Sequence, residues 1–122
     1  MHDFRRLQVW AKARDLAVAI NRLTQRFPRS DRGVVGGQLR RSALSIPSNI
    51  AEGCGKGSRK ETVRFFQIAA GSAKETESHL LIAGDFGYVA PAEREKLVDA
   101  CRSIQRMLSA LMKKLSTDEP NS

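Results

Sequence analysis

The 122-residue chain is 41% hydrophobic and 28% charged, which fits one globular domain and excludes a mainly disordered chain. No apolar run approaches the roughly 20 residues of a membrane-spanning helix, and the first residues lack the apolar stretch of a signal peptide, so we expect a cytoplasmic protein without a membrane partner. The net charge of +8 favours polyanionic partners, and it belongs to the first half, because residues 1–64 hold 14 basic and 5 acidic side chains whereas residues 65–122 hold 7 and 8.

The first predicted helix runs from about Phe4 to Phe27. Its apolar residues recur at alternating intervals of four and three, which is the pattern of a helix that packs along one seam. Phe27 precedes Pro28, which disfavours further helix, and residues 29–32 are expected to form a turn.

A second apolar stripe lies on this helix nearly opposite the seam. An exposed apolar stripe suggests a contact with another subunit, although apolar residues scattered over the surface would give the same pattern. The candidate oligomer contact consists of Leu7, Ala11 and Val18.

The second predicted helix starts near Val34 and continues to about Glu52. Pro47 lies inside it, and because proline has no amide hydrogen to donate to the carbonyl of Ala43, we expect this helix to be kinked. Residues 53–57 are rich in glycine, which suits the end of a helix and a break before the next one.

The third and fourth predicted helices have clear starting signals. Ser58 and Glu61 match a capping box, so the third helix begins there and continues to about Asp85. Pro91 suits the first turn of the fourth helix, whose apolar seam continues to Leu115.

Four helices joined by short loops run alternately up and down around a shared core. We therefore predict an all-α fold, an antiparallel up-down-up-down four-helix bundle with a kinked second helix. The bundle occupies residues 1–115, and residues 116–122 are expected to form a flexible C-terminal tail.

The chain offers no arrangement typical of catalysis or metal binding. His2 and His79 stand far apart in the sequence, and His79 has no serine or cysteine nucleophile beside it. Cys54 and Cys101 lack the pair spacing of a zinc site, and the Glu-x-x-His spacing of di-iron bundles is missing. We predict a non-enzymatic protein with no metal and no cofactor, in which both cysteines are plain thiols.

One carboxylate is expected to need a partner inside the fold. Glu77 projects within the apolar arc of the third helix, and a buried carboxylate requires compensation. Arg40 shares a face with apolar residues of the second helix. We therefore predict a structural ion pair between Arg40 and Glu77.

The basic side chains form groups that suit phosphate contacts. Some lie along the first helix, the turn after it and the second helix, and others surround the start of the third helix, where backbone amides also favour anions. Aromatic side chains that could stack on bases are scarce, which favours recognition of the backbone or of shape. The predicted nucleic-acid-binding residues are Lys12, Arg22, Arg26, Arg29, Arg32, Arg41, Lys56, Arg59, Lys60 and Arg64.

The second helix also carries a distinctive motif. Residues 38–53 read QLRRSALSIPSNIAEG, and this run closely resembles the four-helix-bundle proteins encoded in intervening sequences of bacterial 23S ribosomal RNA genes. Three further segments fit the same family: residues 7–10 (LQVW), residues 65–72 (FFQIAAGS) followed by Glu75 and Glu77, and residues 87–89 (GYV).

The resemblance spans roughly residues 4–115, and it implies an oligomeric state that the periodicity of the apolar residues does not indicate. It implies that the bundles assemble into a homopentamer. The family is also similar to the accessory proteins of diversity-generating retroelements, basic pentamers that associate with a reverse transcriptase and with nucleic acid. Two departures from the family pattern, the pair Gly36-Gly37 and Thr76, bear on the start of the second helix and on one packing layer.

Charge and resemblance together lead to two hypotheses. In the first, the protein is a non-enzymatic homo-oligomer that binds nucleic acid through phosphate contacts, with RNA favoured over DNA. In the second, it is a protein-interaction scaffold or accessory subunit whose basic residues serve subunit contacts and a protein partner such as a polymerase. An affinity that falls steeply with salt distinguishes the first from the second.

Overall fold

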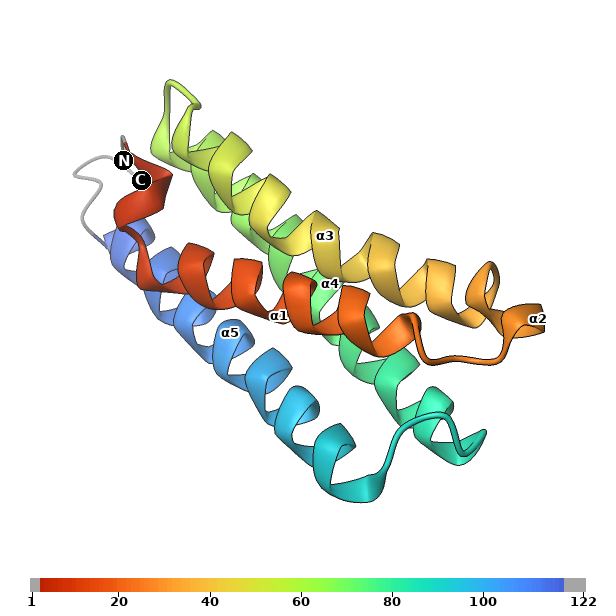
Figure 1. The fold of residues 1–122 in the computed structure, drawn as a ribbon. Helices are drawn as coiled ribbons and strands as arrows, with labels where there is room; N and C mark the ends of the chain where they lie inside the picture. The colour runs from red at the N-terminus through yellow and green to blue at the C-terminus, as the bar shows by residue number, and fades with distance from the viewer. Residues whose placement is uncertain (1–2, 118–122) are drawn as a thin grey trace.

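The computed structural model describes residues 3–117 and confirms the all-α bundle, with no strand in that range. Four long helices run alternately in opposite directions, as Figure 1 shows. A short 3-10 helix, η1 (Phe4–Arg6), precedes them, and a four-residue helix, α2 (Arg29–Arg32), joins the first two. The long helices are α1 (Gln8–Thr24), α3 (Val35–Cys54), α4 (Arg59–Asp85) and α5 (Pro91–Thr117).

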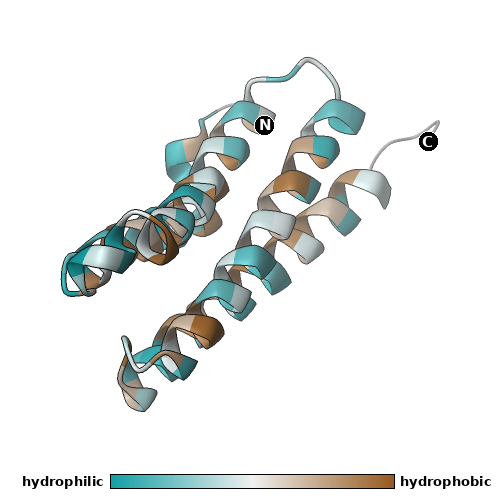
Figure 2. Ribbon diagram, turned by 90° about the vertical axis from the view of Figure 1, so that its right-hand side faces the viewer, coloured by the Kyte–Doolittle hydropathy of each residue, from teal (hydrophilic) through white to brown (hydrophobic). Residues whose placement is uncertain are grey.

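The four long helices close around one core. Helix α1 packs against α3 and α5, and α4 packs against the same two helices from the other side. Figure 2 shows hydrophilic and hydrophobic residues alternating along the helices, as the amphipathic helices of a bundle require. The predicted seam of the first helix is buried from Val9 to Phe27, although α1 itself ends at Thr24, three residues before the predicted end. The seam of α5 is buried from Leu97 to Leu108.

The start of the chain differs from the single long helix predicted there. Leu7 has an extended backbone (φ −80°, ψ 125°), which separates η1 from α1. The side chain of Asp3 caps η1 by accepting a hydrogen bond from the amide of Arg5, and Leu7 packs partly against the core. The predicted turn over residues 29–32 is the helix α2.

The predicted kink is present, since α3 contains Pro47 and bends by 36°. Small polar side chains connect α3 to α4: the hydroxyl oxygens of Ser45 and Ser72 lie 2.8 Å apart. Thr76 is fully buried, and its hydroxyl oxygen lies 2.9 Å from that of Ser42 and 2.8 Å from the carbonyl oxygen of Ser72. The departure from the family pattern at Thr76 therefore creates a satisfied polar link between the two helices.

The start of α3 and the end of α5 also bear on the prediction. Gly36 is buried, and a Cβ atom there would lie 3.4 Å from Cβ of Thr24, so this glycine belongs to the close packing of α3 on α1. Helix α5 continues to Thr117, so the predicted tail began two residues too early. The rest of that tail, residues 118–122, lies outside the described residues.

Candidate nucleic-acid interface

The ten predicted nucleic-acid-binding residues do not form one patch. Arg26, Arg29 and Arg32 lie at the end of the bundle where α1 meets α2, and a second group lies at the opposite end, around the loop from α3 to α4 (Figure 1). The 20 residues of α3 separate the two ends by about 30 Å, at 1.5 Å per residue. We call the second group the loop cluster; it consists of Lys56, Arg59, Lys60 and Arg64.

The loop cluster sits on a well-anchored turn. The hydroxyl of Ser58 accepts a hydrogen bond from the amide of Glu61 at 3.2 Å, which confirms the predicted N-cap of α4. The buried hydroxyl of Thr62 lies 2.8 Å from the carbonyl oxygen of Gly53 and so joins the start of α4 to the end of α3. A Cβ atom at Gly53 would lie 3.0 Å from that of Phe65, which shows how closely the two helices approach here.

One aromatic ring supports two cations of the loop cluster. The ammonium of Lys56 lies 4.8 Å from the ring centre of Phe65, and the guanidinium carbon of Arg64 lies 5.8 Å from it. Such cation–π contacts attract a positive charge without neutralising it. The two side chains are therefore positioned by the fold and keep their full charge for an external anion.

A shallow hollow of about 690 Å³ opens beside the loop cluster at the start of α4. The N-terminus of a helix favours anions because its first amides have no partner within the helix. Glu61 is the acidic member of the lining and accompanies two basic ones. The lining residues are Ser58, Lys60, Glu61, Val63, Arg64 and Gln67.

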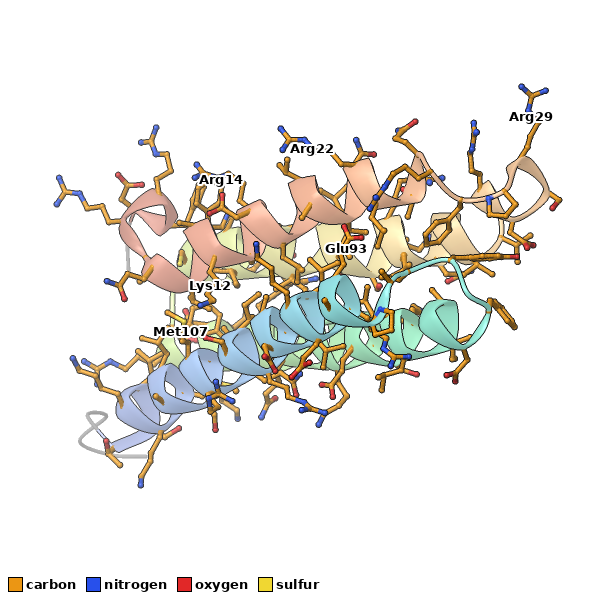
Figure 3. All side chains as sticks on the ribbon, turned by 60° about the horizontal axis from the view of Figure 1, so that its bottom comes forward. Lys12, Arg14, Arg22, Arg29, Glu93 and Met107 are labelled. Carbon is orange, nitrogen blue, oxygen red and sulfur yellow. The ribbon has the colours of Figure 1, made fainter. Side chains whose placement is uncertain are left out.

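Two of the three basic residues at the other end of the bundle, Arg26 and Arg32, have partners within the chain. Arg26 donates to both carboxylate oxygens of Glu93, at 2.7 and 2.9 Å. Arg32 donates through Nε to the carbonyl oxygen of Phe27 at 3.2 Å. Arg29 extends away from the bundle (Figure 3). Lys12 does not belong to this end, because it lies near the start of α1, on the side that faces α5 (Figure 3). This end is therefore a weaker candidate for phosphate contacts than the loop cluster.

A larger groove of about 1100 Å³ runs along the outside of the bundle between α1 and α3. It brings together Val18 from the predicted oligomer contact and Arg22 and Arg41 from the predicted nucleic-acid contacts. We call it the α1/α3 groove; it is lined by Phe4, Trp10, Arg14, Ala17, Val18, Asn21, Arg22, Arg40, Arg41, Leu44, Pro47, Ser48 and Ala51.

The α1/α3 groove combines an apolar floor with four arginines and no acidic lining residue. Arg14 stacks on the ring of Trp10 at 5.3 Å, and Figure 3 shows Arg14 and Arg22 pointing away from α5. Sequence reasoning missed Arg14 as part of this surface. The signal was present, because Arg14, Val18 and Arg22 follow one another at intervals of four and so share one face of α1.

The predicted ion pair between Arg40 and Glu77 was wrong. Glu77 lies on the side of α4 that faces α5, where Nε of Arg102 donates to it at 3.0 Å and Nε2 of Gln105 at 2.9 Å. Arg40 instead donates to the carbonyl oxygen of Arg32 at 3.2 Å. The pairing failed because α3 and α5 flank α4 on different sides, and Glu77 points toward α5.

The environment of Glu77 favours its charged form. The hydrogen bond from Gln105 is the largest cause, and with the Arg102 guanidinium it outweighs the effect of partial burial, so the pKa of Glu77 lies below its ordinary value. The pair of Glu77 with Arg102 and Gln105 joins α4 to α5. This arrangement is structural, since the carboxylate is already occupied by two donors of the same chain.

Both cysteines are free and buried. Burial raises the pKa of Cys101 to about 12, with the Glu77 carboxylate adding to the shift, and burial also raises the pKa of Cys54. Because the thiolate is the reactive form, neither side chain has the character of a nucleophile.

We expect both thiols to resist alkylation in the folded protein. Incubation with iodoacetamide at about pH 8 should label Cys101 only slowly, and unfolding in denaturant should restore an ordinary rate. Since the folded state holds the pKa of Cys101 above its unfolded value, this thiol contributes stability at neutral pH that is lost as the pH rises from about 9 toward 12. Rapid labelling of native Cys101, measured by mass spectrometry, would contradict its burial.

Metal ligands and membrane spans are the remaining features that bear on function. Within residues 3–117, no group of three histidine, cysteine, aspartate or glutamate side chains is placed to hold a metal ion. His79 contacts Glu75 at 3.2 Å, one turn away on the same helix. None of the helices in this range is long and apolar enough to cross a membrane.

The chain is similar to a known protein family in sequence and to a solved structure in fold. A family model described as 23S rRNA-intervening sequence protein matches residues 5–110. The fold is similar to the crystal structure of a protein with unknown function from the S23 ribosomal protein family, from Bacteroides thetaiotaomicron VPI-5482, with a TM-score of 0.79. The sequences of the two chains are 26% identical. The match covers 86% of this chain and 98% of that chain. No curated protein matches the chain in sequence.

Proposed function

This chain belongs to the 23S rRNA-intervening sequence protein family, and from that premise we propose that it is a non-enzymatic, homo-oligomeric protein that binds RNA through phosphate contacts. The loop cluster is the principal contact surface. Lys60 and Arg64 meet phosphates directly, and Lys56 and Arg59 add to the positive field around them.

The observation that carries this proposal is the lack of internal compensation for the basic side chains. Among residues 3–117, Arg26 alone of the ten predicted nucleic-acid-binding residues forms an ion pair with a carboxylate. The loop cluster keeps four positive charges within nine residues of chain, with Glu61 as its acidic neighbour. When uncompensated cations of this kind neutralise phosphates, the counterions condensed on the RNA are released, and this release drives binding.

Oligomerisation would multiply this field. Each chain carries a net charge of +8, so five copies, the number that the family resemblance implies, would carry about +40. Several loop clusters on one particle would contact one RNA together and bind more tightly than one cluster alone. The proposed compartment is the cytoplasm, in keeping with two reduced, buried thiols.

The test is a titration of the purified protein against labelled structured RNA, with duplex DNA in parallel, at about 50 and 200 mM salt. We expect binding to RNA at the lower concentration and an affinity at least about tenfold weaker at the higher one, because counterion release loses its advantage as salt rises. A higher affinity for RNA than for DNA would identify the partner. Absence of binding to both at low salt would overturn the proposal.

A second candidate function is a protein-interaction scaffold, and the α1/α3 groove favours it. The floor of this groove is apolar, and the exposed side chains of Val18 and Leu44 offer contacts that a phosphate backbone does not use. A scaffold would bind RNA weakly, with little dependence on the loop cluster. The same titration therefore separates the two functions.

A further inference from the structure

The α1/α3 groove begins at the end of the bundle that carries the loop cluster. Its lining reaches Ala51 on α3, five residues before Lys56 of the loop cluster. Figure 1 shows η1, the end of α3 and the loop that follows it at this same end. A ligand bound at the loop cluster therefore lies close to the entrance of the groove.

The far end of the groove is cationic. Helices α1 and α3 run in opposite directions, and Gly36 of α3 packs against Thr24 of α1. The arginines that follow Gly36 therefore lie near the one that precedes Thr24, and the groove collects Arg22, Arg40 and Arg41 there. Cations grouped in this way suit the phosphates of a ligand that runs along the groove.

The near end of the groove is aromatic. Aromatic residues are scarce along the chain, yet η1 places Phe4 beside Trp10, with ring centres 5.0 Å apart. The guanidinium carbon of Arg14 lies 5.3 Å from the ring centre of Trp10. Unpaired bases stack on aromatic rings and on guanidinium planes, so this end has the chemistry of a base-binding site.

The middle of the groove is apolar, and its surroundings lack carboxylates. Val18 and Leu44 line it and are 45% and 61% exposed. Among the described residues, the contact of Arg14 with Asp15 at 3.4 Å is the only ion pair that the four groove arginines form, and both of its side chains are mostly exposed. The groove therefore offers flat apolar surface and unneutralised positive charge together.

Single-stranded nucleic acid combines the two features that this lining requires. Its bases have flat apolar faces, and each nucleotide carries one phosphate. In a duplex the same faces are hidden by pairing and stacking, so only unpaired nucleotides can use the groove. Its volume of about 1100 Å³ is at the upper end of sites that hold a ligand of drug size, which is also the size of a nucleotide.

We propose that the α1/α3 groove binds unpaired nucleotides of the same RNA whose phosphates contact the loop cluster. One base lies against Trp10 and Arg14, another covers Leu44, and Arg22 and Arg41 hold phosphates. The proposal rests on the RNA binding put forward above and names the class of RNA: a helical stem with an adjoining single-stranded segment. The stem supplies phosphates to the loop cluster, and the unpaired segment enters the groove.

The fluorescence of the wild-type protein tests this directly, because Trp10 is the only tryptophan of the chain and lines the groove. Three RNAs are compared: a blunt duplex, the same duplex with a short single-stranded overhang, and that duplex with an overhang of abasic nucleotides. We expect the overhang with bases to quench the tryptophan and to bind about tenfold more tightly than the abasic one, since stacking of one base is worth about that factor. The blunt duplex should bind without quenching.

A double substitution that keeps the net charge tests the apolar part of the groove. Val18→Ser with Leu44→Ser changes two exposed side chains, and thermal unfolding checks that the fold is preserved. This variant should lose most of the advantage that bases in the overhang provide, while its affinity for the blunt duplex should be unchanged. Ile68→Ser with Ile82→Ser is the matched control, because these side chains are 42% and 44% exposed on α4 and do not line the groove.

The possible failures separate this inference from the proposed function. Binding of none of the three RNAs would remove both. Binding of the blunt duplex, with no quenching and no advantage for the overhang, would refute the groove site and leave the loop cluster in place. Equal affinity for the two overhangs would show that the groove takes no base.

Two further results would assign the groove to another occupant and so overturn the proposal. The first is a loss of oligomeric mass in the Val18→Ser, Leu44→Ser variant, measured by light scattering without RNA, which would place the groove between subunits. The second is quenching of Trp10 by a helical peptide of leucine and glutamate when the RNA overhang has no effect, which would indicate a protein partner.

Discussion

Replacing Lys60 and Arg64 with glutamate is expected to weaken RNA binding by about a hundredfold or more at about 50 mM salt. Each substitution removes one cation that meets a phosphate and introduces a carboxylate that repels it. In a plot of log affinity against log salt, the slope should also become shallower, by about one unit for each substituted cation. Fluorescence anisotropy with labelled RNA over a series of salt concentrations measures both the affinity and the slope.

The control for this variant must change the net charge by the same amount. Arg106→Glu with Lys113→Glu does so, since either double substitution lowers the net charge from +8 to +4. Both control positions are exposed on α5, a helix that contributes no residue to the loop cluster. Equal weakening of RNA binding in the two variants would mean that RNA responds to total charge, and the loop cluster would have no special role. Unchanged oligomeric mass in both shows that assembly is intact.

The main features of the fold could be predicted because they depend on the order of residues along one helix. The seam of α1 and the cap at Ser58 are local patterns, and the structure confirms both. The separation of η1 from α1 at Leu7 could not be predicted, because the apolar spacing continues through the break. Leu7 is extended there and packs partly against the core, which is a tertiary effect.

The contacts between helices were harder to predict than the helices themselves. Periodicity places Glu77 at the edge of the buried face of α4, but it does not say which neighbouring helix lies beyond that edge. The sequence therefore suggested Arg40 on α3, whereas the structure has Arg102 on α5. Arg102 had the character of a solvated residue, because it is surrounded in the sequence by other charges of both signs.

The two candidate surfaces also differ in how far the sequence predicts them. The loop cluster could be predicted, because its residues lie within nine positions of one another. The α1/α3 groove could not, because Val18 and Leu44 come from helices whose relative placement the sequence leaves open.

Removing the ring of Phe66 is expected to be the most damaging single change to the fold. The side chain is fully buried, and ring atoms lie 3.2 Å from where a Cβ atom at Gly53 would be, so the ring fills a place where α3 and α4 approach closely. Phe66→Ala leaves a cavity that costs about 3–5 kcal/mol. Against a typical total of about 5–15 kcal/mol, this destabilisation should bring the protein close to unfolding.

Thermal unfolding at one fixed protein concentration measures this effect, because oligomers unfold at concentration-dependent temperatures. For a chain of this size we expect the midpoint to fall by about 10–20 °C. Phe65→Ala is the matched control. Its ring is only half-buried and supports Lys56 and Arg64, so its removal should cost about 1 kcal/mol or less in stability. It should, however, weaken RNA binding, since neither cation then has the ring that positions it. Equal drops in the unfolding midpoint for the two variants would contradict the division of neighbouring phenylalanines between core and binding surface.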